Sequence, residues 1–152
     1  MADPKQILAA AKRILLVDWP NESVPRTLIA AGFKVFGFSP KGYTEASVVS
    51  HQPEKGDGIS ILPPANRDGG YLVFRRLDEG PGNIDIVNVF RPTEEIPGII
   101  ETIAIPVGAR ILWRQPPFAS TEAVDLISAK GLELIEGIDI ADVARQLKKS
   151  EL

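Results

Sequence analysis

The sequence of 152 residues contains no cysteine and only one histidine. The absence of cysteine excludes disulfides, thiolate metal sites and a cysteine nucleophile, and it fits a reducing cytoplasm. With a formal net charge of -3 and no Lys/Arg cluster, we expect no nucleic-acid partner. No apolar run is long enough to span a bilayer, and the N-terminal segment is too short and too charged for a signal peptide. We therefore expect a cytoplasmic protein with no membrane partner.

Residues suited to catalysis are also scarce. The lone histidine, His51, has no second histidine or cysteine with which to bind a metal, so we expect no metal and a solvated loop side chain. A Ser-His-Asp triad would require His51 to fold over Ser23 or Ser39, and no sequence pattern places it there. Asp18 and Glu136 could act as acid and base, but they are better explained as capping neighbouring N–H groups or pairing with Arg91 or Arg114. We therefore expect that the protein is not an enzyme. A small hydrolase or transferase that uses Asp18 or His51 is a third possible class of function.

Apolar segments that alternate with helix signals dominate the rest of the chain. Continuous apolar runs are typical of parallel strands that are buried on both faces. The strong candidates are "RILLVDW" (13–19), "KVFGFSP" (34–40), "NIDIVNVFR" (83–91), "ARILWRQ" (109–115) and "LELIEG" (132–137), and "GYLVFRRL" (70–77) is weaker. Trp113 lies within such a run, so we expect it in the core.

Capping residues mark five helices between these strands. The expected starts are Asp3, Asn21, Thr93, Ser120 and Asp139, and Gly32 and Gly131 are natural C-terminal ends. Apolar stripes are predicted at Ile96, Ile99, Ile100 and Ile103 in the third helix and at Ile140, Val143, Ala144 and Leu147 in the last. The order predicts the α/β fold class: one Rossmann-like domain over residues 1–152, with a mostly parallel sheet of five to six strands and helices on both faces. Residues 44–69 read as an irregular loop insertion, either a functional lid or a tolerated surface loop.

Candidate ligand-binding residues follow from this topology, because open α/β sheets bind ligands beyond the carboxyl ends of their strands. The residues expected there are Asp18, Trp19, Pro20, Asn21, Ser39, Pro40, Lys41, Arg91, Arg114 and Gln115. Lys41, Arg91 and Arg114 would converge on one rim and bind an anion. Alternatively, Arg91 and Arg114 cap neighbouring carbonyls or pair with Asp18. Trp19 would line the cleft or pack as a lid over the end of the sheet.

The segment "DIVNVFRPTEEIPGIIETIAIPVGARILWRQ" (85–115) resembles the second half of the small bacterial CoA-binding proteins, which share a Rossmann domain with succinyl-CoA synthetase. That family typically reads D-x-V-x-V-F-R, then an acidic helix, then A-I-x-x-G-A-K-x-x-W-x-Q. "AGFKVFGFSPKGY" (31–43) resembles its second strand, G-Y-x-V-x-x-V-N-P. The likeness spans roughly residues 10 to 140 without the 44–69 segment. It implies a nucleotide-like ligand, CoA or an acyl-CoA.

The sequence departs from the family pattern where that ligand would lie. The family enters its first helix through V-G-x-S-x-x-P-x-R-P-S, whereas this turn is shorter and lacks the Gly-x-Ser. Asp18 brings a negative charge to the place where a phosphate would arrive. After Trp-x-Gln the family has Leu-Gly, but Pro116 and Pro117 offer no N–H here. We therefore expect a rebuilt phosphate turn that lacks the usual backbone amides.

The resemblance favours a small non-catalytic protein that binds CoA, an acyl-CoA or a related phosphorylated nucleotide. The alternative is a diverged member that has lost the ligand and serves as a protein interaction module, for which a homodimer is the candidate assembly.

Overall fold

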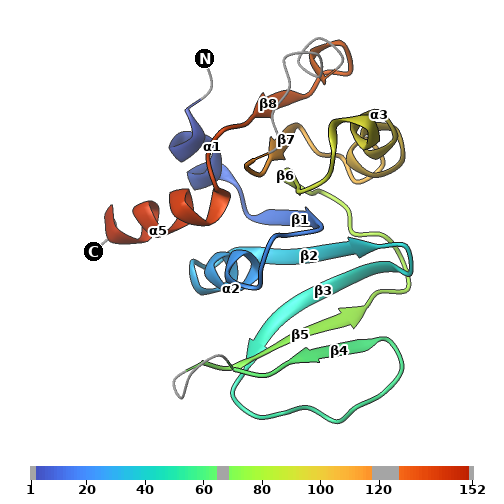
Figure 1. Ribbon diagram of the computed structural model, residues 1–152, viewed down its shortest axis with the longest axis vertical. Helices are drawn as coiled ribbons and strands as arrows, with labels where there is room; N and C mark the ends of the chain where they lie inside the picture. The colour runs from blue at the N-terminus through green and yellow to red at the C-terminus, as the bar shows by residue number, and fades with distance from the viewer. Residues whose placement is uncertain (1–2, 65–68, 118–126, 151–152) are drawn as a thin grey trace.

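The computed structural model describes residues 3–64, 69–117 and 127–150, and the strands in these ranges form one eight-stranded sheet. The strand order is β4-β5-β3-β2-β1-β6-β7-β8 (Figure 1). The strands are β1 (Arg13–Val17), β2 (Lys34–Ser39), β3 (Gly42–Val49), β4 (Ile59–Leu62), β5 (Tyr71–Arg76), β6 (Ile86–Val89), β7 (Ile111–Arg114) and β8 (Glu133–Ile135).

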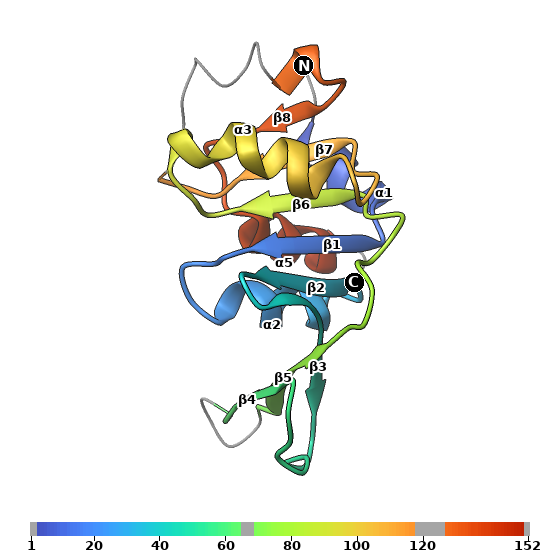
Figure 2. The same cartoon turned by 90° about the vertical axis from the view of Figure 1, so that its right-hand side faces the viewer.

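The sheet has a parallel part and an antiparallel extension. Strands β2, β1, β6, β7 and β8 pair in parallel, as the apolar runs predict. β3, β5 and β4 continue the sheet beyond β2 in antiparallel pairings and form the extension at the lower end of Figure 2. From β1 the chain passes to β2 on one side and later to β6 on the other. The strand order therefore reverses between β1 and β6, which is where α/β sheets bind ligands.

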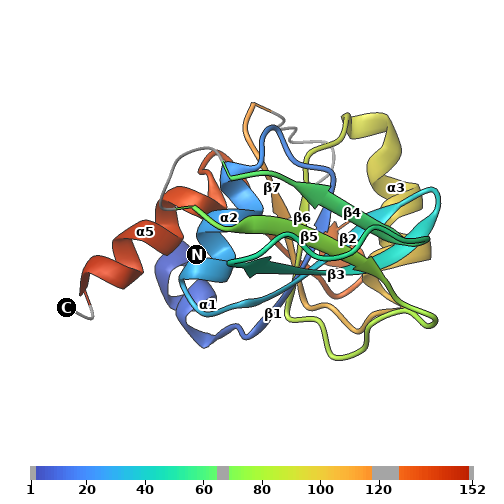
Figure 3. The same ribbon diagram turned by 90° about the horizontal axis from the view of Figure 1, so that it is seen from below.

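Helices cover both faces of the parallel part, which confirms the predicted Rossmann-like α/β fold. Figure 2 shows α3 in front of the sheet and α1, α2 and α5 behind it, and Figure 3 shows the same layers from below. The bounds are α1 (Pro4–Ala10), α2 (Ser23–Ala30), a 3-10 turn η1 (Thr93–Glu95), α3 (Ile96–Ile99), a π-helical turn η2 (Ile100–Ala104) and α5 (Ile140–Ser150).

Alternation along the strands divides the core between these two faces. Leu16, Ile86 and Trp113 pack with α1, α2 and α5, while Leu15 and Val87 pack with α3 and η2. The four predicted isoleucines of the third helical segment are all buried, and so are Ile140, Val143 and Ala144 of α5. Trp113 is fully buried and donates its indole N–H to the carbonyl of Ile138, which confirms its predicted core position.

Several predicted helix ends are confirmed, whereas Thr93 is not a cap and α2 begins at Ser23 after its N-cap residue Glu22, slightly later than the predicted start at Asn21. Asp3 and Asp139 cap α1 and α5 through their carboxylates, and Gly32 and Gly131 follow their helices with positive φ. Thr93 does not cap a helix: the 3-10 turn has no side-chain cap, and the Thr93 hydroxyl instead accepts a hydrogen bond from buried Arg114. The predicted start at Ser120 lies outside the described residues.

The prediction of an irregular insertion over 44–69 is wrong where β3 and β4 lie. β3 covers Gly42–Val49 and β4 covers Ile59–Leu62. Both strands belong to the antiparallel extension, so they are only partly buried and carry polar residues such as Glu45, Ser47 and Ser60. Antiparallel strands with one wet face alternate apolar and polar residues, and they lack the continuous apolar run that reveals a buried parallel strand.

Asp85, the first residue of the D-x-V-x-V-F-R pattern, lies at the amino edge of the sheet, away from the strand ends that bind ligands. Its carboxylate accepts the backbone N–H groups of Lys12 and Arg13 at 2.8 and 2.9 Å, which ties the start of β1 to the segment before β6. We expect Asp85→Ala to lower the free energy of unfolding by about 1–2 kcal/mol, because two backbone donors lose a charged acceptor. Urea denaturation measures this, and unchanged ligand affinity in the folded variant would separate Asp85 from the site.

Candidate functional site

A cavity of about 420 Å³ opens at the carboxyl ends of β1, β2 and β6, at the point where the strand order reverses. Its walls combine apolar side chains with a small charged group. The lining residues are Val17, Asp18, Trp19, Phe38, Ser39, Pro40, Arg91, Glu95, Ile99 and Ile103. Ligand cavities are commonly apolar with a few placed polar groups, and this size lies within their usual range of about 300–1,000 Å³. We call this space the switch-point cavity.

The charged group in the switch-point cavity is an arginine held between two carboxylates. Arg91 donates to both carboxylate oxygens of Glu95, with its shortest contact at 2.6 Å, and its Nη1 lies 3.0 Å from Oδ2 of Asp18. Asp18 has a φ of 64°, in the left-handed region that aspartate tolerates better than most residues. The turn therefore keeps, without a glycine, a backbone conformation that glycine adopts most easily.

This arrangement makes Arg91 a poor free anion receptor. The hydrogen bonds that Arg91 donates to Glu95, and then to Asp18, raise the pKa of Arg91 above its usual value, so the guanidinium remains charged. The three groups together carry one net negative charge when all are ionised. A phosphate approaching Arg91 must therefore compete with both carboxylates. The structure agrees with the interpretation in which Arg91 pairs with Asp18.

Trp19 forms one wall of the switch-point cavity and is also packed from behind. Its ring stacks on Phe74 of β5, with centroids 5.0 Å apart and an angle of 11° between the planes. The two interpretations of Trp19, as a cleft wall and as a packed lid, therefore both describe it. The stack holds the indole in place and joins the turn after β1 to the antiparallel extension.

Arg114 and Gln115 lie beneath the rim and do not line the cavity. Arg114 is fully buried; its Nη2 donates to the Arg91 carbonyl at 3.4 Å and to the Thr93 hydroxyl at 3.1 Å, and its Nη1 lies 3.8 Å from Glu136 Oε2. The expected convergence of three cations on one rim is therefore not what the structure has. Arg114 instead has the alternative role, capping the carbonyl of a neighbouring residue and pairing with a carboxylate.

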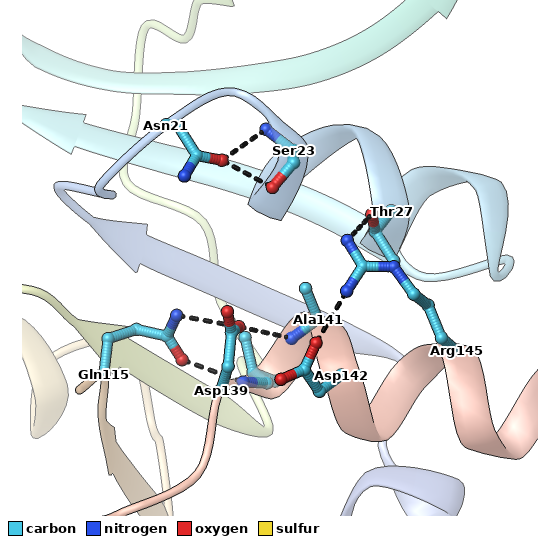
Figure 4. Close-up of polar contacts among 9 residues, drawn as sticks. Asn21, Ser23, Thr27, Gln115, Asp139, Ala141, Asp142 and Arg145 are labelled. Atoms are coloured by element: carbon cyan, nitrogen blue, oxygen red, sulfur yellow. Dashed lines mark hydrogen bonds and ion pairs between the residues drawn. The ribbon is translucent and has the colours of Figure 1, made fainter.

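Gln115 is the centre of a buried hydrogen-bond network that positions α5 (Figure 4). Its Oε1 accepts from Asn88 Nδ2 at 3.2 Å and from the Ile140 N–H at 2.8 Å, while its Nε2 donates to Asp139 at 3.0 Å. The same Asp139 carboxylate oxygen accepts the Ala141 N–H. Gln115 and Asp139 thus occupy the first free N–H groups of α5, which removes that helix start as an anion site.

The start of α2 is occupied in a similar way. Asn21 Oδ1 accepts the backbone N–H of Ser23 at 2.9 Å and also the Ser23 hydroxyl (Figure 4). Farther along, Arg145 of α5 donates to the Thr27 hydroxyl at 3.2 Å and so joins α5 to α2. Pro20 and Asn21 do not line the switch-point cavity. The helix start that would normally hold a phosphate therefore already has an internal acceptor.

Lys41 also lies outside the switch-point cavity. It lines a neighbouring pocket of about 340 Å³ between the β2–β3 turn and the start of β4, and Ser39 lines both spaces. The structure therefore gathers Asp18, Trp19, Ser39, Pro40 and Arg91 around one cavity and places Lys41 beside it.

Sequence reasoning missed Glu95, Phe38, Ile99 and Ile103 as cavity residues. The sequence could have indicated Glu95, because a carboxylate four residues after Arg91 is well placed to form an ion pair with it on one helical turn. Phe38 and the two isoleucines carried only a signal for burial.

His51 is exposed in the segment between β3 and β4, and it does not line the switch-point cavity. Within the described ranges, no three His, Cys, Asp or Glu side chains are grouped to hold a metal ion. None of the helices in the described part of the chain has the length and apolar character needed to cross a bilayer.

Comparisons with known proteins show which family the chain resembles. The model of the CoA binding domain family matches residues 17–140. A curated relative, the uncharacterized protein YneT of Bacillus subtilis (strain 168), is 27% identical over 140 residues, which is 88% of this chain and 86% of that protein.

Solved structures share the fold at low identity. The PH1109 protein redesigned for binding has a TM-score of 0.64 at 18% identity, covering 95% of this chain and 89% of that one. A hypothetical protein from Pyrococcus horikoshii OT3 has a TM-score of 0.62 at 22% identity with the same coverage. Cell-free ID.343 from Thermus thermophilus has a TM-score of 0.60 at 18% identity, covering 96% and 99%.

Proposed function

The chain belongs to the CoA-binding domain family, and from that membership we propose that it binds CoA, an acyl-CoA or a related phosphorylated nucleotide without catalysing a reaction. The observation that carries the proposal is the switch-point cavity between β1 and β6, at the position where doubly wound sheets hold nucleotides. Its apolar walls suit the uncharged parts of such a ligand.

The non-catalytic part of the proposal rests on the chemistry of the cavity walls. Among the described residues that line the switch-point cavity, the titratable side chains are Asp18, Arg91 and Glu95. Because these three are paired with one another, none is poised as a nucleophile or a general base. Ser39 also lines the cavity, but its hydroxyl oxygen accepts the Lys41 N–H in the turn after β2.

Trp19 provides a direct test, because it lines the switch-point cavity while Trp113 is fully buried in the core. We expect titration with CoA, up to millimolar concentration, to change the fluorescence of the wild-type protein through Trp19. Trp19→Phe should abolish that change, and calorimetry on the same variant reports whether CoA still binds. A fluorescence change that persists undiminished in Trp19→Phe would place the ligand elsewhere.

The interaction module remains the alternative, and a homodimer and a cytoplasmic location remain predictions. Native mass spectrometry of the purified protein separates the two functions. A bound nucleotide-like molecule favours the binding protein. A stable dimer that takes up neither CoA nor acyl-CoA in solution favours the interaction module.

A further inference from the structure

The pocket beside the switch-point cavity has a different chemical character. It lies between the β2–β3 turn and the facing ends of β4 and β5 and has a volume of about 340 Å³. Its lining is polar and contains two cations and one carboxylate: Ser39, Lys41, Gly42, Tyr43, Thr44, Asp57, Gly58, Ile59, Ser60 and Arg76. We call it the extension pocket, because most of its walls belong to the antiparallel extension.

The two cations of the extension pocket differ from Arg91 in their pairing. Neither Lys41 nor Arg76 takes part in the ion pairs found among the described residues, although Asp57 lines the same pocket. Both side chains are exposed, so an anion can reach them without displacing a carboxylate. With all three groups ionised, the pocket carries one net positive charge, opposite in sign to the Asp18–Arg91–Glu95 group.

Arg76 is held in position by a glycine. Its backbone N–H donates to the carbonyl of Gly58 at 2.6 Å, and its side chain lies across the face of that glycine. A Cβ at position 58 would stand 3.0 Å from Arg76 Cβ and 3.1 Å from its Nε, and Gly58 has a φ of 75°. The positive φ favours glycine there, and the close approach shows that the backbone of the β3–β4 connection lies against the stem of Arg76.

Hydrogen-bond donors complete the extension pocket. Burial raises the pKa of the Tyr43 hydroxyl above its usual value, so this group stays protonated and can donate. The Ser60 side chain is exposed in the pocket wall. The hydroxyl oxygen of Ser39 accepts the Lys41 N–H, so the hydroxyl hydrogen of Ser39 is free to point into the pocket. Two cations with several hydroxyl donors suit a phosphate monoester, which offers three acceptor oxygens and about two negative charges.

The extension pocket adjoins the switch-point cavity. Ser39 lines both, and Phe38 on the wall of one contacts Tyr43 on the wall of the other, with ring centroids 5.2 Å apart. One elongated molecule can therefore occupy both. We propose that the extension pocket binds a phosphate monoester of the ligand, with Arg76 as its principal cation, while the body of the ligand lies in the switch-point cavity. This assignment rests on the proposed function, and it locates the charge of the phosphate monoester, but not that of the CoA diphosphate, away from Asp18.

The experiment compares CoA with dephospho-CoA, which lacks the phosphate monoester, by calorimetry. We expect the wild type to favour CoA by roughly 10-fold or more, the usual value of a charge-assisted contact. Arg76→Ala should reduce that preference to below about twofold, and Arg76→Lys should retain part of it because the charge remains.

Arg75→Ala is the matched control. Arg75 is the preceding residue of β5, is also exposed, and points to the opposite face of the strand because successive side chains alternate. The substitution removes the same charge at nearly the same place, and Arg75 is not one of the residues that line the pocket. It should keep the preference for CoA, so loss of the preference in both variants would show a general charge effect and overturn the assignment.

The second experiment is a titration with inorganic phosphate, in which the backbone amide chemical shifts of the protein are measured by NMR. We expect shifts at residues 41–44, 58–60 and 76 in the wild type and in Arg75→Ala, and none there in Arg76→Ala. If phosphate causes these shifts and no CoA species binds, the extension pocket stands as an anion site while the proposed function fails. If CoA binds without preference over dephospho-CoA, the proposed function stands and the extension-pocket assignment fails. If neither CoA nor dephospho-CoA binds and phosphate causes no shifts at these residues, both fail.

Discussion

Gln115→Leu is expected to lower the free energy of unfolding by roughly 2–4 kcal/mol, because buried polar groups left without partners cost about 1–3 kcal/mol each. Leucine has nearly the same volume, so the loss comes from hydrogen bonding and not from a cavity. The Ile140 N–H and the Asn88 amide lose their acceptor, and Asp139 loses a donor. Oδ1 of Asn88 already has no hydrogen-bond partner among the described residues, so this network has little redundancy. Urea denaturation monitored by circular dichroism gives the value.

Gln52→Leu is the control for this substitution. Gln52 is exposed in the segment between β3 and β4, so the same chemical change there should alter the free energy of unfolding by no more than about 0.5 kcal/mol. A Gln115 variant as stable as the control, but with lost CoA binding, would show that Gln115 reaches the ligand. Its place at the carboxyl end of β7 made that role the natural prediction from sequence.

The positions of Gln115 and Arg114 in the structure show what the sequence could and could not predict about the site. Apolar runs locate the ends of the strands, and the parallel order assigns those ends to one edge of the sheet. Whether a side chain at that edge points into solvent, into a helix start or under the rim depends on which face it occupies and on the segments packed there. Arg114 turns toward Thr93 and Glu136, and Gln115 turns toward α5.

The antiparallel extension was less predictable for a different reason. The parallel strands are buried on both faces, so their continuous apolar runs identify them in the sequence, as in β1 and β6. In the extension, Arg75 and Arg76 close β5 with exposed charges, and β4 has four partly buried or exposed residues. Such strands depend on their neighbours for pairing, so local sequence gives little sign of them. The extension pocket, whose walls come mostly from this region, was missed for the same reason.

Asp18→Asn is expected to raise the affinity for CoA by roughly 5- to 30-fold, since it removes a negative charge from the switch-point cavity, which would border the CoA diphosphate. Asp18 is half exposed, with 48% of its side chain accessible, so solvent screening keeps the effect below that of a buried charge. The change also replaces the carboxylate that faces Nη1 of Arg91 with a neutral amide, so Arg91 keeps its ion pair with Glu95 but loses the one with Asp18. Asparagine tolerates the left-handed backbone at this position, so stability should change little.

The wild type should bind CoA with a dissociation constant above about 10 μM, which leaves room for this gain to be measured by calorimetry. Glu133→Gln provides the matched control: it removes one negative charge at the start of β8, at the amino edge of the sheet, where the residue is exposed. That variant should change CoA affinity less than about twofold, because the charge lies far from the cavity and is screened. Equal gains in both variants would mean that net charge alone sets the affinity. Submicromolar binding by the wild type would instead mean that the shortened turn holds phosphate despite Asp18, through donors that the Asp18–Arg91–Glu95 group leaves available.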